Sequence, residues 1–319
     1  MSRSARRSSS WLFLGVATLA SLMALPSAHS QVTRTATAQK TPATSAPARA
    51  TPDPTAPTKR LIGGDVAPVR GTVLPKSVQQ GALVIGRTHQ AATVEFGGRM
   101  LRVSPNGLFV FGVDRDEKGP LVVNIKQPGT SIVPHRIEVT PRDWPIERVN
   151  GAPPKTVNPP PEIAERISRE QALIVAARKR DDAREDFAQR FVWPVQGRIS
   201  GRFGNQRIYD GTPKSPHGGM DIAAPNGTAV KSPAGGIVIF AAKDLYLTGG
   251  TVLIDHGAGV SSNFLHLSRV DVKVGDRVEQ GQIIAAVGAT GRATGPHLHW
   301  GMHCNGVRVD PLLVLELGK

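Results

Sequence analysis

The stretch His217-Gly218-Gly219-Met220-Asp221, together with Gly295-Pro296-His297-Leu298-His299-Trp300 further along the chain, decides how this sequence is interpreted. Side chains alternate along a β-strand, so an extended segment points both histidines of the His-Leu-His triplet to one face. The same alternation places His217 and Asp221 on one face. Two imidazoles and one carboxylate, with a fourth position open to water, form the ligand set of a hydrolytic zinc site. The pattern offers one imidazole more than that set needs.

Composition sets outer limits on the fold and on the partners. A chain of 319 residues is long enough for about two domains. Its formal net charge of +14 favours an anionic or surface-bound partner. Nucleic acid would be the first candidate for such a charge. However, aromatic residues make up only 5% of the chain, and the N-terminal sequence predicts secretion. We therefore expect no nucleic-acid partner.

The N-terminus has the three parts of a secretory signal. Three arginines in the first seven residues precede an apolar run over 11–25, which is too short for a good membrane span. Ala28-His29-Ser30 fits a cleavage site, so residues 1–30 are predicted to be a signal peptide. An uncleaved anchor is the alternative. We expect a periplasmic or secreted protein with no stable membrane span after cleavage.

Cys304 is the only cysteine, so no intramolecular disulfide can form. It lies near the presumed site and is an alternative metal ligand. A buried, inert thiol is the other interpretation.

Composition changes along the chain predict a mainly β protein with several segments. Residues 31–65 are rich in Ala, Thr and Pro and are predicted to be a disordered linker. Residues 66–145 hold short branched runs separated by Gly, Pro and Asp, which predicts a small antiparallel β-sandwich. Residues 146–190 form a Pro-rich break followed by a connector helix. Residues 191–319 are β-rich again and predict a compact antiparallel β domain that carries the site.

The connector is expected to be helical from Glu162 to Arg190. Pro161 suits a first helical turn, and Ile163, Ile167 and Ile174 fall on one face. Two interpretations stay open: a connector packed on a neighbouring domain, or a lid that controls access to the site.

Four motifs in order carry a resemblance to a known family. They are Ser200-Gly-Arg-Phe-Gly204, His217-Gly-Gly-Met-Asp221-Ile-Ala-Ala-Pro225, Leu265-His266-Leu-Ser268 and Thr290-Gly-Arg-Ala-Thr-Gly-Pro-His297-Leu-His299. Over about residues 192–312 the chain resembles the lysostaphin/LytM-type zinc metallopeptidases, secreted enzymes that cut peptide cross-bridges of bacterial peptidoglycan. Residues 66–140 resemble the β-rich N-terminal domain of some members more weakly.

The resemblance implies a role for each matching position. His217, Asp221 and His299 match the zinc ligands, and His266 and His297 match catalytic residues beside the metal. Both catalytic-type histidines can exchange protons with water and a leaving amine, or can instead orient a ligand. Which of the two acts as the base stays open.

Two aromatic positions bear on the comparison with the family. Tyr209 matches a tyrosine that is thought to help stabilise the oxyanion or contact substrate; an aromatic that packs the loop is the alternative. Phe264 stands where many members have tyrosine, and the missing hydroxyl is expected to alter substrate contacts.

Three further features near the site have structural interpretations. His256 is expected to close a turn, and His303 is expected to be structural or to line the cleft. The glycine-rich stretch 288–295 lacks the Gly-Lys-Ser/Thr ending of a phosphate-binding loop. We expect it to be a turn that lets the backbone approach the zinc cleft.

These observations predict a secreted zinc metalloendopeptidase that hydrolyses peptide cross-links of peptidoglycan through a metal-activated water. Its expected partners are peptidoglycan stem peptides, with cell-wall amidases or other wall-remodelling proteins as further candidates. The alternative is a non-enzymatic LytM-type regulator that activates cell-wall amidases, although such regulators have typically lost zinc ligands. The N-terminal β domain is the candidate for wall anchoring, and the helix for covering the cleft in a resting state.

Overall fold

The computed structural model describes residues 71–318 of the chain. The predicted signal peptide, the predicted linker and residues 66–70 of the predicted N-terminal domain lie outside this range. Within it, no helix is both long and apolar enough to cross a membrane. The described residues are mostly β, which confirms the predicted fold class.

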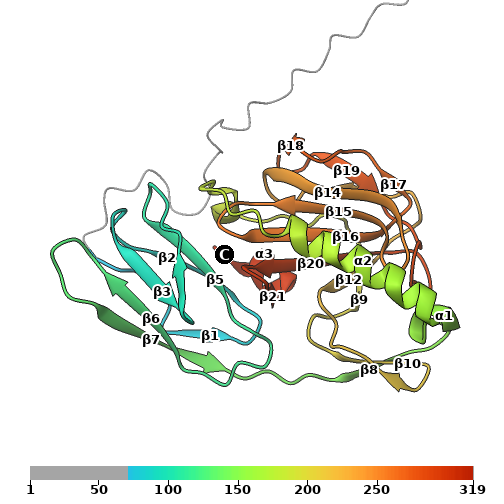
Figure 1. The fold of residues 1–319 in the computed structure, drawn as a ribbon, viewed down its shortest axis with the longest axis horizontal. Coiled ribbons are helices and arrows are strands. Elements are labelled where there is room, and N and C mark those ends of the chain that lie inside the picture. The colour runs from blue at the N-terminus through green and yellow to red at the C-terminus, as the bar shows by residue number, and fades with distance from the viewer. Residues whose placement is uncertain (1–70, 319) are drawn as a thin grey trace, which may run out of the picture. The chain divides into compact units, whose positions relative to one another are not determined.

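The first part of the described chain is a small β-sandwich (Figure 1). One sheet has the order β1-β7-β6-β3-β4, and β2 and β5 form a two-stranded second sheet. The strands are β1 (Ser77–Gln79), β2 (Leu83–Arg87), β3 (Thr93–Phe96), β4 (Arg99–Leu101), β5 (Leu108–Gly112), β6 (Leu121–Lys126) and β7 (Val133–Thr140). Burial alternates along β6, as expected for a strand with one face in a core. The sandwich was expected to be antiparallel, but the short edge strand β1 pairs with β7 in parallel.

Strand β5 belongs to two cores at once, because all five of its residues are buried. Phe109 and Phe111 pack in the core of the sandwich. Leu108 and Val110 point the other way, into the core of the C-terminal part. The sandwich is therefore joined to the C-terminal part by apolar packing as well as by the connecting chain.

A strand lies where the sequence predicts a Pro-rich break. Strand β8 (Ile146–Val149) pairs in parallel with β10 (Gln206–Tyr209), which also pairs with β11 (Thr212–Pro213). Two apolar residues in four give too weak a pattern to predict β8 from the sequence alone. The pairing sets Glu147 opposite Arg207.

The helical region ends earlier than the sequence predicts. A single turn, α1 (Pro154–Val157), precedes α2 (Pro161–Ala177), and a short 3₁₀ turn follows at Asp186–Ala188. The expected helix up to Arg190 is wrong, because ion pairs hold the charged stretch after Ala177 against the C-terminal sheet. Asp186 is fully buried and receives two hydrogen bonds from Arg277, at 2.6 and 2.8 Å, while Arg184 pairs with Asp186 and Asp255.

The C-terminal part is built on one large sheet, in the order β18-β14-β15-β16-β20-β12-β9, with β21 paired to β20. A three-stranded sheet has the order β13-β19-β17. The strands are β9 (Arg198–Gly201), β12 (Met220–Ala223), β13 (Ala229–Lys231), β14 (Gly236–Leu245), β15 (Gly249–Asp255), β16 (Val260–Leu267), β17 (Arg269–Val270), β18 (Arg277–Val278), β19 (Ile283–Ala286), β20 (His297–Cys304) and β21 (Val307–Val309); helix α3 (Pro311–Glu316) follows.

The alternation along β20 decides which face of the sheet can hold a site. Leu298, Trp300, Met302 and Cys304 are all fully buried in the core. The intervening positions, which include all three histidines of the strand, therefore face the opposite side. Helix α2 lies against β14, where Arg166 donates to the Asp244 carbonyl, and is tied to the turn after that strand, where the Tyr246 amide donates to Glu170 (Figure 1).

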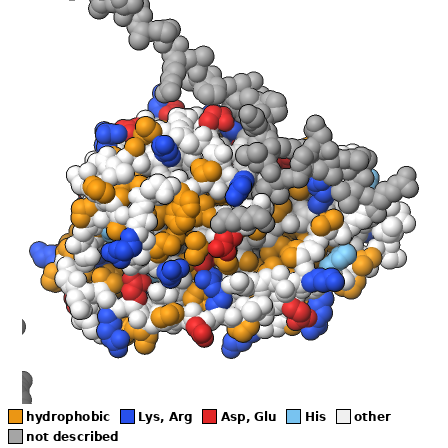
Figure 2. Space-filling view, turned by 180° about the vertical axis from the view of Figure 1, so that it is seen from behind, with side chains coloured by type: hydrophobic (Ala, Val, Ile, Leu, Met, Phe, Trp, Pro, Cys, Tyr) orange, Lys and Arg blue, Asp and Glu red, His pale blue; other side chains and the backbone are white. Residues whose placement is uncertain are grey.

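Positive charge is dispersed on the surface that Figure 2 shows. Lys and Arg side chains are scattered there among acidic and hydrophobic ones. The described residues on this face do not line up into the continuous basic stripe that is typical of nucleic-acid binding.

We predict that folding stability falls in acid through His256. This fully buried ring bonds to the Gly235 carbonyl at 2.7 Å and to the Ser262 hydroxyl at 2.8 Å, and burial lowers its pKa to about 4. Between about pH 6.5 and pH 4, His256 is therefore protonated in the unfolded chain but neutral in the folded chain. Stability from this residue is full above that window and is lost as the pH falls through it, by about 3 kcal/mol at most.

The measurement is urea unfolding across pH 4–8 in the wild type, in His256→Asn and in the exposed control His89→Asn. The difference in stability between wild type and H256N should shrink as the pH falls, while H89N should track the wild type. Parallel curves for wild type and H256N would contradict this role.

Candidate active site

Strand pairing brings two of the predicted metal ligands together. In the antiparallel pair of β12 and β20, Asp221 stands directly opposite His299. Side chains directly opposite on one face of a sheet have Cβ atoms about 5 Å apart. The third ligand, His217, comes from the loop before β12, where its amide donates to the Asn205 carbonyl at 2.9 Å.

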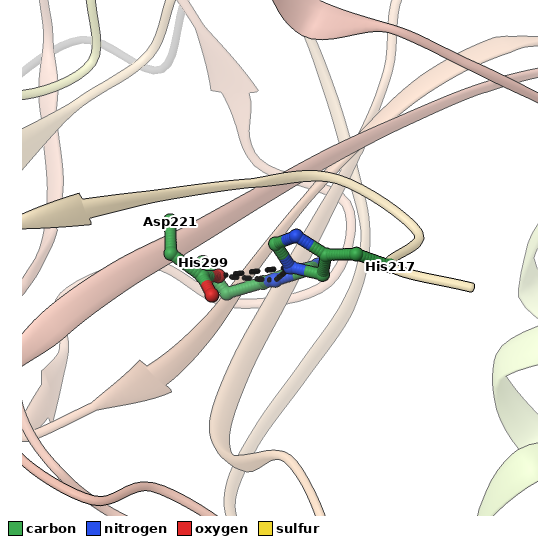
Figure 3. A group of neighbouring side chains, drawn as sticks. All are labelled: His217, Asp221 and His299. Atoms are coloured by element: carbon green, nitrogen blue, oxygen red, sulfur yellow. Dashed lines mark hydrogen bonds and ion pairs between the residues drawn. The ribbon is translucent and has the colours of Figure 1, made fainter. Parts of the chain in front are cut away.

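The three side chains converge on one point, as Figure 3 shows. The Nδ1 atom of His299 lies 2.8 Å from Oδ1 of Asp221 and 3.0 Å from Nε2 of His217. The same Nε2 atom lies 3.1 Å from Oδ1 of Asp221. One ligand atom from each residue therefore faces the two others.

The donor set fits a metal ion. His217 uses Nδ1 to bond the Arg202 carbonyl at 3.0 Å, which leaves Nε2 to face the cluster. Burial alone would raise the pKa of Asp221, but the neighbouring His217 and His299 hold it well below its usual value. The carboxylate is therefore ionised, and two imidazole nitrogens with one carboxylate oxygen match the ligands that zinc prefers.

Arg207 holds the second oxygen of the carboxylate, and sequence reasoning missed it. Its guanidinium lies 2.5 Å from Oδ2 of Asp221 and also donates to the Tyr209 hydroxyl at 2.9 Å and to Glu147 at 3.3 Å. Gly201 makes room for this contact, because a Cβ there would lie 2.7 Å from both Arg207 and Asp221. Alternation along β10 puts Arg207 and Tyr209 on one face, but the sequence pattern does not show that this face meets Asp221.

The two catalytic-type histidines lie beside the metal cluster. The rings of His266 and His297 have centroids 4.8 Å apart, and Nε2 of His297 lies 3.9 Å from Oδ1 of Asp221. The glycine-rich loop orients both rings: Nδ1 of His266 bonds the Thr290 carbonyl and Nδ1 of His297 bonds the Gly295 carbonyl, each at 2.8 Å. Each ring therefore keeps its Nε2 atom available for chemistry.

His266 has a backbone conformation that is rare for a residue with a side chain. Its φ angle is +63°, in the left-handed region. Such outliers cost of order 1–3 kcal/mol and cluster at functional sites. Burial, and then the nearby imidazoles of His297 and His299, lower the pKa of His266 to about 3. The ring is therefore neutral at physiological pH.

The other singled-out residues have distinct surroundings. Tyr209 lines the cleft with its hydroxyl bonded to Arg207, while Cys304 is fully buried in the core, where burial raises the pKa of its thiol to about 12. Phe264 is also fully buried in that core. The expectation that Phe264 alters substrate contacts is therefore wrong. The reason is local: the left-handed turn at His266 breaks the alternation that would put the two side chains on one face.

The four histidines of the site line one cleft of about 850 Å³: His217, His266, His297 and His299. Helix α2 supplies part of its wall through Gln171, Ile174 and Arg178. The lining is rich in cations, and among the described residues its only acids are Glu147 and Asp221, both bonded to Arg207. The cleft therefore suits an anionic, extended ligand.

Comparison with known proteins identifies the family of this chain. The model of peptidase family M23 matches residues 215–311. A putative M23 peptidase of known structure from Pseudomonas aeruginosa is 31% identical, with a TM-score of 0.58, and the match covers 74% of this chain and 94% of that one. The chain belongs to peptidase family M23, which confirms the LytM-type resemblance.

Curated relatives match less than half of this chain. The peptidoglycan DD-endopeptidase ShyA of Vibrio cholerae is 37% identical over 135 residues, which is 42% of this chain and 31% of that protein. The cell division protein DipM of Caulobacter vibrioides is 36% identical over 132 residues, covering 40% of this chain and 21% of that protein. The chain thus spans less than a third of the length of these relatives.

We predict that Arg207→Ala weakens zinc binding about 10- to 100-fold, because the Asp221 carboxylate loses the partner that orients it. The measurement is zinc affinity by competition with a chromogenic chelator. Arg198→Ala, which removes an exposed arginine from the same cleft, is the matched control. Unchanged or tighter zinc binding in R207A, with the fold intact by circular dichroism, would contradict the positioning role.

Proposed function

We propose that the protein is a zinc metalloendopeptidase that hydrolyses peptide cross-links of peptidoglycan in the bacterial cell envelope. One observation carries the proposal: the His217, Asp221 and His299 cluster shares its cleft with His266 and His297. A regulator without activity would need neither the complete ligand set nor the two additional oriented imidazoles.

In this proposal His217, Asp221 and His299 hold the zinc ion. The chemistry that zinc supplies at such a site is Lewis-acid activation of water and of a carbonyl group. Arg207 keeps one oxygen of Asp221 aimed at the cluster by holding the other. The remaining work of catalysis is assigned to side chains of the cleft.

His266 and His297 move the protons. Both have Nδ1 bonded to a loop carbonyl, so that Nδ1 carries the hydrogen and Nε2 is the basic atom that faces the cleft. Either ring can accept the proton of the attacking water at Nε2 and return it to the leaving amine. Their fixed orientation saves the cost of ordering them during the reaction.

Tyr209 is the candidate to stabilise negative charge on the carbonyl oxygen. Its hydroxyl oxygen accepts a hydrogen bond from Arg207, so its own hydrogen stays available to donate into the cleft. Arg292 also contacts the ring, with its guanidinium carbon 4.6 Å from the ring centroid. Packing in the loop and contact with the oxyanion are therefore compatible.

The nature of the relatives supports peptidoglycan as the substrate. ShyA and ShyC of Vibrio cholerae are both peptidoglycan DD-endopeptidases. We propose a D,D-cross-link as the bond cut here. The predicted signal peptide supports a periplasmic or secreted location, and the cationic cleft suits stem peptides that carry free carboxylates.

We predict that the protein lacking residues 1–30 binds one zinc ion and releases muropeptides from purified sacculi. His217→Ala should lose both zinc and cleavage. His297→Ala should keep zinc and lose about 10²- to 10⁴-fold in rate, because only proton transfer is removed. His89→Ala, in an exposed loop, is the control.

Zinc content is measured by atomic emission and cleavage by chromatography of released muropeptides. Zinc binding with no cleavage of any sacculus preparation would overturn the enzymatic proposal and favour the amidase-activating regulator. In that case, stimulation of a cell-wall amidase would be the next measurement.

A further inference from the structure

One wall of the cleft carries two arginines and a histidine that the proposed mechanism does not use. Arg178 is the C-terminal capping residue of α2. His303 and Arg308 stand opposite each other in the hairpin of β20 and β21. All three line the cleft that holds the metal cluster, and all three also line an adjoining hollow of about 630 Å³. We name these residues the basic cluster.

The basic cluster lacks anionic partners within residues 71–318. Arg178 makes one weak hydrogen bond, 3.4 Å long, to the side-chain oxygen of Asn263, and its Nε atom is buried without a partner. No carboxylate in the described part of the chain lies within ion-pair distance of Arg308. The neighbouring acids are already engaged: Asp181 with Arg102, and Asp182 with Arg180 and Arg184.

His303 is the most enclosed member of the cluster. The residue is 8% exposed, it lines the cleft, and its Nδ1 atom is buried with no hydrogen-bond partner among the described residues. Buried polar atoms are nearly always satisfied, so an unsatisfied one at the edge of a cleft points to a missing ligand. Burial, together with the nearby Arg308, lowers the pKa of Arg178 to about 10, as expected for a cation with no counter-ion.

The cluster lies close enough to the metal site to act on the same ligand. Arg308 covers Gly218, the residue after the metal ligand His217, since a Cβ there would lie 3.3–3.4 Å from the guanidinium. His303 follows His299 by four residues on the same face of β20, about 13 Å along the strand. An extended peptide of about four residues spans that distance.

We propose that the basic cluster is a subsite that binds a free carboxylate of the peptide substrate, away from the bond that is cut. The inference rests on the proposed function. Arginine is suited to this task because its planar guanidinium binds carboxylates through paired hydrogen bonds. A ligand carboxylate would satisfy the unpaired Arg178 Nε and His303 Nδ1 atoms and neutralise two neighbouring cations at once. The subsite would select cross-links whose stem peptides keep that carboxylate free.

The test compares two cross-linked muropeptide dimers that differ only in whether the carboxyl groups remote from the scissile bond are free or amidated. In Arg178→Gln and Arg308→Gln, KM for the free-acid dimer should rise about 10-fold or more, which is about 1.4 kcal/mol, with kcat nearly unchanged. The amidated dimer should be a poor substrate of the wild type and insensitive to either substitution. Arg178→Lys should recover part of the loss.

Arg198→Gln is the matched control, since it removes the same charge from an exposed part of the cleft. Equal losses on both dimers, or equal losses in R198Q, would show a general charge effect and overturn the subsite. No change in R178Q and R308Q would overturn it as well. Two dimers, each amidated on one strand only, identify which carboxylate is bound.

Binding separates this inference from the proposed function. The probe is N-acetyl-D-alanyl-D-alanine and its C-terminal amide, titrated against the ¹H–¹⁵N spectrum of the His303 side chain. Wild type should bind the acid more tightly than the amide, and R178Q should not distinguish them, even if no cleavage occurs. Equal binding of acid and amide by the wild type would contradict binding of this particular carboxylate. If the enzyme also cleaved the two mono-amidated dimers equally well, the subsite would be rejected. Loss of cleavage with this binding intact would reject only the peptidase.

Discussion

The antiparallel pairing of Asp221 with His299 is the constraint on which the site depends. It fixes a carboxylate and an imidazole side by side on the open face of the large sheet, while Trp300 and Met302 anchor the same strand in the core. A shift of one residue in this register would bury the histidines and expose the core residues. The core of the C-terminal part therefore specifies the site, and the loop bearing His217 needs only to close over it.

Around that pair the structure maintains a balance of charge that is unusual for a buried region. The Asp221 carboxylate lies between two imidazoles and the Arg207 guanidinium, while His266 stays neutral through burial. A further excess of positive charge is left along the wall formed by α2 and the last hairpin. Unpaired cations are costly in a protein interior, so retaining them in a cleft is consistent with binding an anionic substrate.

Whether a contact could be predicted from the sequence depends on how far apart in the chain its residues lie. The ligand spacing within 217–221 and 297–299 is local, and alternation along a strand converts it directly into geometry. Arg207 and Arg178 could not be assigned roles because their partners are set by tertiary packing: one by the parallel pairing of β8 with β10, the other by where α2 ends. Helix propensity alone predicts that α2 continues through the charged residues after Ala177. Propensity contains no information about the buried partners of Asp186.

The proposed function requires His217, Asp221 and His299 to hold one zinc ion. The most direct measurement is a crystal structure of the zinc-loaded protein with diffraction data on both sides of the zinc absorption edge. We expect one anomalous peak bound by Nε2 of His217, one carboxylate oxygen of Asp221 and Nδ1 of His299, with Arg207 on the other oxygen. A peak held by other residues, or none after equilibration with zinc, would contradict it.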